Sequence, residues 1–289
     1  MTYHRKYLSS SVLAVTAFVA LLLSNPSPGL AVPILGSDLA SFAVLGATEV
    51  TNVPTSTIGG NLGAASGTSI GSGYDFTSGS LQSNTPLAQN AQLQLDAAIL
   101  ALNNPILVGI PVLLGSGDLS TLGPILPGNY IVPNLAINIS GALTLDGGGS
   151  NAAVWVFHFP STTLTTSTTS TVNVVNVGDG AGVGLYWDVG STAVLNGPLF
   201  AGNVLAGTSI TSDGDLTIAC GRLLAATGEV TLIHDTISTG CQGTGFGSGG
   251  FDQGGSGGQS VVPEPGTFLL LSFGLAGLFT FRKRLFPVA

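Results

Sequence analysis

Few side chains in this sequence are of the types that carry out acid–base or nucleophilic chemistry. Arg222 is the only Lys or Arg outside the two ends of the chain, so it is the sole candidate for the base that a polysaccharide lyase needs. His158 lies in the most apolar predicted strand, residues 154–159, which predicts a histidine satisfied within the core. His234 precedes Asp235, but no serine or cysteine nucleophile stands near this pair in a recognisable context. The sequence therefore favours a protein that is not an enzyme.

The carboxylates make a weak case for a metal. Asp213 and Asp215 flank Gly214. Two carboxylates around a glycine can supply oxygen ligands to calcium, but they more often form a turn. We therefore expect no metal and no cofactor.

The hydroxyl side chains suggest a surface rather than a reaction centre. Hydroxyl residues repeated once per coil form ladders, about 4.7–4.9 Å apart between strands and about 7 Å apart along a strand. Each threonine alone is equally well explained as a surface residue with high β-propensity. The sequence places Thr162, Thr192 and Thr208 on one column, Thr165, Thr211 and Thr231 on another, and Thr48 and Thr68 in the first half of the chain.

The elements that carry these threonines repeat. The apolar anchors Val194, Ile210 and Val230 lie 16 and 20 residues apart, and each follows small and hydroxyl residues. Val50 and Ile70 show the same spacing of 20 residues in the first half of the chain. A period of this size, with small residues at the corners, predicts the coils of a β-solenoid.

One stretch breaks this pattern and predicts the only helix, at about residues 87–103. Its apolar positions recur at steps of three and four residues and make one stripe. Thr85-Pro86 is a plausible helix start, and Asn103-Asn104-Pro105 ends the helix. The stripe needs a partner surface, so we expect the helix to lie along one side of the solenoid.

Both ends of the chain resemble processing signals. Arg5-Lys6 precede an apolar run at 12–23, and small residues follow at 29–31, which predicts a cleaved signal peptide over 1–31. The body then spans 32–240, and a Gly/Ser-rich linker spans 241–261.

The last segment, 262–289, has three parts. Pro263-Glu264-Pro265 precede an apolar stretch at 268–281, which approaches the length that spans a bilayer. Arg282-Lys283-Arg284 follow it, and basic residues after the last apolar span favour a cytoplasmic end before processing.

The charge balance excludes one class of partner. Of the six Lys and Arg residues, only Arg222 lies in the body and linker, which together carry thirteen of the fourteen acidic residues. Phosphate binding needs clustered Lys and Arg. We therefore expect no nucleic-acid partner.

The sequence contains two cysteines, Cys220 and Cys241. In a chain predicted to enter an oxidising compartment they favour a disulfide, worth about 3 kcal/mol by loop-entropy arguments. A metal or redox pair is the alternative, but ligands at a suitable spacing are lacking.

A series of short blocks follows in order along residues 39–238. The blocks include Phe42-Ala43-Val44-Leu45, Gly60-Asn61-Leu62-Gly63, Pro127-Gly128-Asn129-Tyr130, Ala153-Val154-Trp155-Val156-Phe157 and Gly202-Asn203-Val204-Leu205-Ala206-Gly207-Thr208. Together they resemble the microbial ice-binding protein family. The resemblance implies a discontinuous three-faced β-solenoid, all-β with a single long α-helix packed alongside, and a threonine-rich face that adsorbs to an ice crystal. It also makes the threonines named above the candidate ice-binding residues.

The tail separately resembles the PEP-CTERM sorting signal of Gram-negative bacteria, through Pro263-Glu264-Pro265, the apolar span and the final basic residues. This resemblance implies cleavage by an exosortase, after signal peptidase has acted at the other end. It also implies a transient membrane anchor and export to the cell surface or extracellular matrix.

One alternative function stays open at this point. The same fold can serve as a non-enzymatic matrix or adhesion protein that binds extracellular polysaccharide or neighbouring cells. Sugars stack on aromatic rings, so an aromatic ladder beside the threonines would favour this reading. The sequence offers Tyr186 and Trp187 in one strand but no such ladder.

Overall fold

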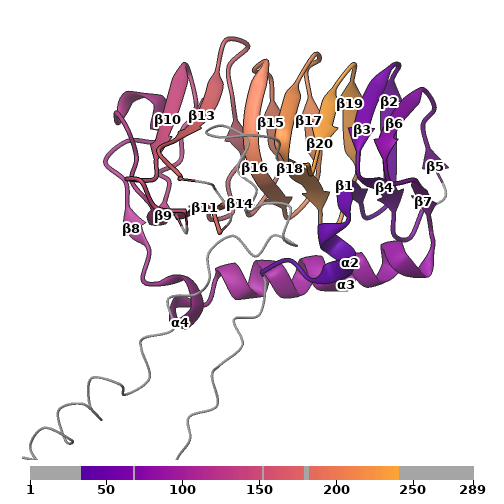
Figure 1. The fold of residues 1–289 in the computed structure, drawn as a ribbon, viewed down its shortest axis with the longest axis horizontal. Helices are drawn as coiled ribbons and strands as arrows, with labels where there is room; N and C mark the ends of the chain where they lie inside the picture. Colours follow the sequence, from indigo (N-terminus) through magenta and orange to yellow (C-terminus); the bar gives the residue numbers. More distant parts are fainter. Residues whose placement is uncertain (1–33, 68, 152, 179–181, 241–289) are drawn as a thin grey trace, which may run out of the picture. The chain divides into compact units, whose positions relative to one another are not determined.

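The computed structural model describes residues 34–240, apart from 68, 152 and 179–181, and all of them belong to one compact unit. The described chain is mostly β, and every strand pair is parallel. Figure 1 shows the strands stacked side by side along the long axis of the molecule. The predicted linker and tail, the signal peptide and the apolar span at 268–281 lie outside the described residues. No helix among the described residues is long and apolar enough to cross a membrane.

The strands fall into two sheets. The first has 14 strands and follows the order β6-β3-β20-β18-β16-β14-β11-β9-β8, with β1, β4, β7, β10 and β13 branching from this path. The second has six strands in the order β12-β15-β17-β19-β2-β5. The bounds in the first half of the chain are β1 (Phe42–Gly46), β2 (Glu49–Val53), β3 (Ser56–Gly59), β4 (Asn61–Ala64), β5 (Ser69–Ile70), β6 (Tyr74–Ser78), β7 (Leu81–Ser83), β8 (Val112–Leu113), β9 (Gly128–Ile131) and β10 (Ala142–Asp146). Those in the second half are β11 (Val154–Phe159), β12 (Leu164–Thr165), β13 (Thr171–Val175), β14 (Gly184–Val189), β15 (Ala193–Leu195), β16 (Leu199–Ala206), β17 (Ile210–Ser212), β18 (Thr217–Ala225), β19 (Val230–Ile233) and β20 (Thr236–Ser238).

The two longest strands divide the 14-stranded sheet into two rows. The start of β18 pairs with β20, whereas its end pairs with β1. In the same way β16 pairs first with β13 and then with β14. We call the row that runs through β4, β1, β14, β11 and β9 the helix row, and the row that runs through β3, β20, β13 and β10 the middle row.

The order of the coils in space differs from their order in the sequence. The last strands of the body pair with the first ones, since β19 pairs with β2 and β20 pairs with β3. The coils formed by residues 42–83 therefore stack on the C-terminal end of the repeat series. The chain must then return along the whole stack before it can build the coils that begin at β8.

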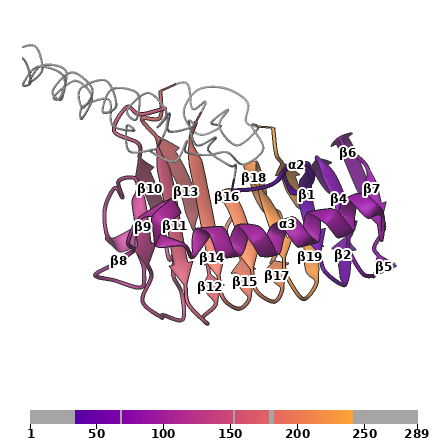
Figure 2. The ribbon, with the colours of Figure 1, turned by 90° about the horizontal axis from the view of Figure 1, so that it is seen from below.

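The long helix α3 (Pro86–Leu102) makes this return. It has 17 residues, so it spans about 25 Å, the width of roughly five parallel strands. Figure 2 shows α3 crossing the helix row from near β7 to near β11. Thr85 caps its start, because its Oγ1 accepts a hydrogen bond of 3.3 Å from the Ala88 amide.

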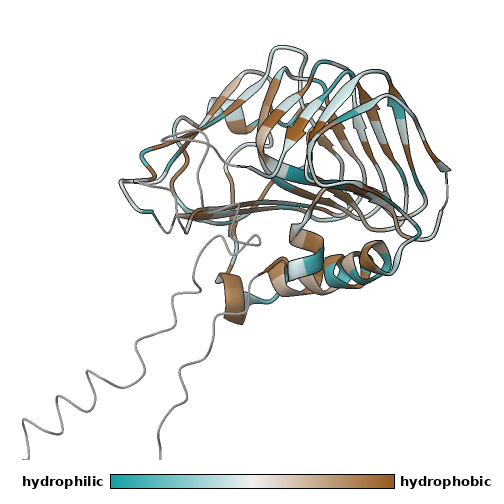
Figure 3. Cartoon of the chain, turned by 45° about the vertical axis from the view of Figure 1, so that its right-hand side comes forward, coloured by the Kyte–Doolittle hydropathy of each residue, from teal (hydrophilic) through white to brown (hydrophobic). Residues whose placement is uncertain are grey.

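The helix lies one residue from the bounds that the sequence predicts, but it is not alone. Two further helices, α2 (Ser37–Ala40) and α4 (Pro105–Val108), have four residues each, and η1 (Leu119–Thr121) is a single 3-10 turn. Figure 3 colours α4 hydrophobic, and Ile106 in α4 is 90% exposed. The Pro- and Leu-rich segment after α3 is therefore a turn of helix followed by the edge strand β8.

Apolar side chains form two cores. The first fills the inside of the coils and holds a stack of aromatic rings, in which Phe157 lies 5.5 Å from Tyr130 and 4.7 Å from Trp187, and Trp187 lies 5.1 Å from Phe200. The second lies between α3 and the helix row. On α3 it is built largely from alanines, which let the helix approach the strands closely. The helix residues buried there are Ala88, Ala91, Leu95, Ala98 and Leu102.

Arg222, the sole candidate for the base of a lyase, is a buried structural residue. It lies within β18 and is 1% exposed. Its Nε and Nη2 donate to the Ala40 carbonyl at 3.0 and 2.7 Å, and Nη1 donates to Asn203 Oδ1 at 2.9 Å. The single cation of the body therefore joins α2 to the helix row and is not available to a substrate.

Cys220 is also in β18 and is fully buried, and no free cysteine occurs among the described residues. Its predicted partner Cys241 lies just beyond them. The pairing of Cys220 with Cys241 stays a prediction.

Candidate functional site

The candidate site is the outward side of the six-stranded sheet, which we call the threonine face. Side chains along its strands alternate between the inside and the outside of the coils. Five strands each contribute one fully buried residue, and these residues pair in register: Leu164, Ala193, Ile210, Val230 and Val50. The residues before and after each of them must then point outward. Two rows of outward side chains run across the sheet.

In each strand, the residue that follows the buried position points outward, and these residues form what we call the second row of the threonine face. Thr165 pairs with Val194, Val194 with Thr211, Thr211 with Thr231, and Thr231 with Thr51. The hydroxyls of Thr51 and Thr231 are 3.0 Å apart. Val194 interrupts the hydroxyls but keeps the branched shape of threonine, so a branched side chain continues across five strands.

The residues before the buried positions make the first row. In spatial order they are Thr163, Thr192, Ser209, Glu229, Glu49 and Ser69, and the last two pair directly. Thr192 Oγ1 lies 3.4 Å from Ser209 Oγ and 2.8 Å from the hydroxyl of Thr208, which is exposed in the turn before β17. The pKa of Glu229 is raised by its hydrogen bond with Glu49, by burial and by the charge of Glu49.

The structure brings together five of the eight threonines that the sequence proposes. Thr165, Thr211 and Thr231 share the second row. Thr192 lies in the first row, and its hydroxyl is close to that of Thr208, which lies beside this row. The proposed column of Thr162 with Thr192 and Thr208 does not form, because the Thr162 hydroxyl oxygen is buried. Thr162 follows Ser161, whose φ of 55° turns the chain before β12 begins.

The first-half threonines are displaced as well. Thr48 is exposed in the turn before β2, and Thr68 lies outside the described residues. The residue that continues the second row is Thr51, which sequence reasoning missed. The signal was present, since Thr51 follows Val50 as Thr211 follows Ile210 and Thr231 follows Val230.

Close approach of the coils at one corner keeps the threonine face in register. Gly207 follows β16 and Gly190 follows β14, in equivalent positions of neighbouring coils. A Cβ atom on Gly207 would lie 2.7 Å from the Gly190 carbonyl oxygen. Glycine is needed there because any side chain would push the two coils apart.

A second row of threonines lies on the middle row of the other sheet. Thr171 pairs with Leu199, Leu199 with Thr217, Thr217 with Thr236, and Thr236 with Thr57. This row was missed in the sequence, because its members do not share a fixed distance from the anchors of the repeat. We call it the middle threonine row.

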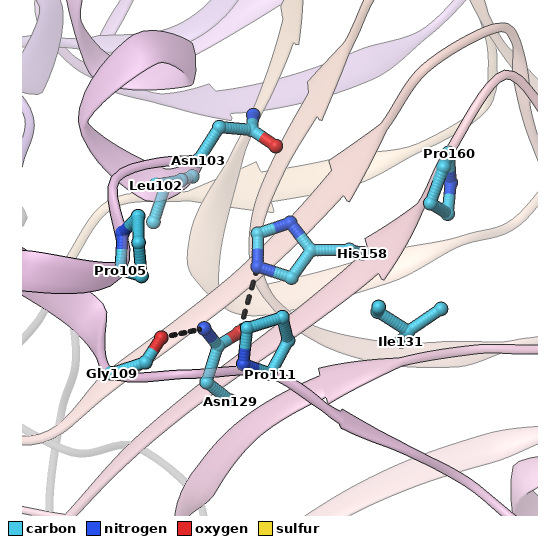
Figure 4. A pocket seen from close by; sticks show the side chains of 9 residues that line it. All are labelled: Leu102, Asn103, Pro105, Gly109, Pro111, Asn129, Ile131, His158 and Pro160. Carbon is cyan, nitrogen blue, oxygen red and sulfur yellow. Dashed lines mark hydrogen bonds between the residues drawn. The ribbon is translucent and has the colours of Figure 1, made fainter.

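The residues first considered for catalysis do not assemble into a site. His158 is 6% exposed, its Nδ1 lies 2.8 Å from Asp188 Oδ2, and its Nε2 lies 2.7 Å from Asn129 Oδ1. Figure 4 shows it on the wall of a cavity of about 290 Å³. Asn129 in turn donates to the Gly109 carbonyl at 2.7 Å. Both ring nitrogens are thus engaged in holding strands and the end of the α4 turn together.

The other polar candidates are structural too. Asp235 is buried and accepts hydrogen bonds from Ser212 Oγ and from the amides of Leu216 and Ile233, whereas His234 is exposed with a φ of 53°. Asp213 and Asp215 are exposed at the turn after β17. No group of three or more His, Cys, Asp or Glu side chains within the described ranges is arranged to hold a metal ion.

Comparison with known proteins gives a family. The family model described as ice-binding-like matches residues 44–238, and the PEP-CTERM protein-sorting motif matches residues 261–284. A protein of Nostoc sp. (strain HG1) described as "Ice-binding protein" is 35% identical over 286 residues, which cover 97% of each chain. Both resemblances inferred from the sequence are thereby confirmed.

Solved structures of ice-binding proteins have the same fold. The protein of the Antarctic ascomycete Antarctomyces psychrotrophicus superposes with a TM-score of 0.62 at 29% identity, over 73% of this chain and 99% of that one. A protein from an Antarctic biological consortium gives 0.59 at 28% identity, over 73% and 93%. The DUF3494 domain of a Shewanella frigidimarina ice-binding protein gives 0.59 at 20% identity, over 72% and 97%, which supports the fold alone.

Proposed function

Because the chain belongs to the ice-binding-like protein family, we propose that it is an exported protein that adsorbs to ice through the threonine face. The observation that carries this proposal is the second row of that face, Thr165–Val194–Thr211–Thr231–Thr51, which stays in register over five strands. Adsorption to ice needs no acid, base or nucleophile. The protein accordingly acts by binding and not by catalysis.

The chemistry of the face suits an ordered layer of water. Neighbouring members of a row are about 4.7–4.9 Å apart, and the two rows are about 7 Å apart, so side chains form a two-dimensional grid. Hydroxyl groups bond water at fixed points, and the methyl groups between them keep other water orientations out. A rigid grid of this kind binds water in a lattice close to that of ice without using charge.

The architecture fits a flat face. The helix row, the middle row and the six-stranded sheet make up a three-faced solenoid, in which α3 covers one face and leaves the other two open. The close-packed coils hold the face rigid, so adsorption costs little conformational entropy.

The sorting motif supports the proposal of export. Residues 1–31 act as a cleaved signal peptide, 241–261 as a linker, and the tail as an exosortase substrate that anchors the precursor through 268–281. Residues Pro263, Glu264 and Pro265 with Arg282, Lys283 and Arg284 are the parts that the processing machinery reads. The mature protein is released at the cell surface or into the extracellular matrix.

The alternative reading, a matrix or adhesion protein that binds polysaccharide, has no support from the comparisons. The aromatic stack that it would use is inside the coils, since Phe157 and Trp187 are fully buried and Phe200 is 2% exposed. It cannot stack on a sugar.

The test is ice affinity and inhibition of ice recrystallisation by the purified protein. We expect both activities in the parent, and a strong loss in Thr211→Tyr, because the ring stands in the middle of the grid. A melting curve should show the fold of this variant intact, since surface substitutions change stability by about 0.5 kcal/mol or less. A parent without ice activity would overturn the proposed function.

A further inference from the structure

The threonine face carries two carboxyl groups side by side. Glu229, directly before β19, and Glu49 of β2 are neighbours across the sheet, because Val230 pairs with Val50. A hydrogen bond between the two carboxyls, which needs a proton on one of them, raises the pKa of Glu229. Hydroxyl residues stand on both sides in the same row, Ser209 beyond Glu229 and Ser69 beyond Glu49.

Within the part of the chain that the structure describes, no cationic side chain faces this pair. The neighbours are Ser209, directly before β17, and Ser69 on β5, and Thr231 and Thr51 follow along the strands of the pair itself. Among the described residues neither glutamate makes an ion pair. The other ionisable groups around the sheet are Asp213 and Asp215, exposed after β17, His234, exposed beyond the far end of β19, the buried Asp235 after it, and Tyr74, whose hydroxyl lies 3.5 Å from the Val50 carbonyl oxygen. Arg222 is buried in β18 on another row.

We propose, on the basis of the proposed function, that the Glu49–Glu229 pair controls the affinity of the threonine face for ice and makes adsorption stronger as the pair takes up protons. A carboxylate orients the water around it toward its own charge. Two carboxylates in the middle of the first row therefore hold water that does not match the neutral lattice ordered by the threonines. A carboxyl pair that shares one proton carries half the charge, and a fully protonated pair behaves as two more neutral hydrogen-bonding groups of the grid.

The sharpest test keeps the pH constant and removes the charge. Glu49→Gln/Glu229→Gln keeps the size of both side chains and makes them neutral. The matched control is Asp96→Asn, because Asp96 is an exposed acidic residue of α3 that lies away from the face. Recrystallisation inhibition by parent, double variant and control is measured at about pH 7 and about pH 5, toward the ordinary pKa of glutamate of about 4.3, with a melting curve for each.

We expect the parent to inhibit more strongly at the lower pH, and the double variant to inhibit more strongly than the parent at pH 7 with that pH dependence lost. The Asp96→Asn protein should keep the behaviour of the parent. Ice activity that does not change with pH in the parent, or a pH dependence that survives in the double variant, would overturn the role of the pair and leave the proposed function standing. Absence of ice activity at both pH values would overturn the proposed function itself. Should the double variant unfold, Glu229→Gln alone should inhibit more strongly than the parent at pH 7 and depend less on pH, and a single variant that matches the parent at both pH values would overturn the role of the pair.

Discussion

The two threonine rows of this protein look alike in composition, but they lie on sheets that differ in regularity. Each holds four threonines and one apolar residue in register, with Val194 in the threonine face and Leu199 in the middle threonine row. The five strand pairings of the six-stranded sheet have no register shift over the residues described. The sheet that carries the middle threonine row has register shifts next to that row, between Phe200 and Gly202 in the β16–β18 pairing and between Ile58 and Gly59 in the β3–β6 pairing.

The difference teaches that threonine repetition alone does not mark a binding face. Threonine suits the exposed side of any strand, so a coiled repeat places it on more than one side. A β-bulge turns side chains out of line and bends the strand. Only a sheet without bulges extends a grid in both directions, and this is the reason to choose the threonine face.

A pair of matched tyrosine variants tests the difference between the two rows most directly. Thr211→Tyr interrupts the threonine face and Thr217→Tyr interrupts the middle threonine row, each next to the apolar member of its row. We expect nearly complete loss of recrystallisation inhibition in the first and little change in the second. Melting curves should agree within the effect of about 0.5 kcal/mol typical of surface changes.

The reverse result would move the site. If Thr217→Tyr abolishes inhibition and Thr211→Tyr does not, ice binds the middle row, and the regularity argument is wrong. Equal losses would mean that both faces contribute.

A second way to sharpen the comparison is to disturb the register of the threonine face from its corner. Gly207→Ala brings a Cβ atom to 2.7 Å from the Gly190 carbonyl oxygen, so the two coils must separate. Overpacking of this kind costs about 1–3 kcal/mol, and we expect a lower melting temperature together with weaker ice activity.

Gly115→Ala is the control for this variant, because nothing lies within 4 Å of a Cβ built on Gly115. It should melt with the parent and bind ice like it. A Gly207→Ala protein as stable and as active as the parent would show that the corner does not set the spacing of the face.

These corners and anchors also show how far sequence reasoning reaches. Ile210 and Val230 repeat at coil length, and they do form one inward column with Val50 from the first half of the chain, but Val194 does not belong to it, because Ala193 pairs with Ile210 and Val194 faces outward beside Thr211. Periodicity fixes such columns because a buried side needs an apolar residue in each coil. The helix α3 was predictable for the same reason, because its apolar stripe and its capping residues are both visible in the local sequence.

Other features depend on pairings that no local pattern determines. The contact between Thr51 and Thr231 joins residues 180 positions apart. Nothing in the first coils indicates that they stack on the last ones, so the sequence placed Thr48, two residues before the anchor, in the site instead of Thr51. Thr162 was misplaced because the turn at Ser161, with its positive φ, shifts the start of β12.

The acidic pair gives a pH-dependent prediction for stability. The pKa of Glu229 is raised in the folded protein, by its hydrogen bond with Glu49, by burial and by charge. A raised pKa means that the folded state binds protons more readily than the unfolded state, so the contribution is fully present below the unfolded pKa and is lost as the pH rises through the folded one.

Relative to the Glu49→Gln/Glu229→Gln protein, the parent should therefore gain thermal stability as the pH falls from about 7 to about 5, above the ordinary glutamate pKa of about 4.3. Calorimetry at the two pH values measures this difference. A constant difference between parent and variant would show that the carboxyls do not interact in the folded state.

The smallest expected effect separates the hydroxyl from the methyl group within the second row. Thr231→Val makes position 231 like Val194, which the row already accepts, and removes the hydroxyl bonded to Thr51 at 3.0 Å. The exposed hydrogen bond contributes about 0.5–1.5 kcal/mol at most, and valine favours strands, so we expect a stability change of less than about 1 kcal/mol. Ice activity should fall modestly, because the grid keeps its shape but loses one point that fixes water. Thr236→Val in the middle threonine row is the matched control, and it should leave activity unchanged. If Thr231→Val and its control inhibit recrystallisation equally well, the branched shape of the row, and not its hydroxyls, is what binds ice.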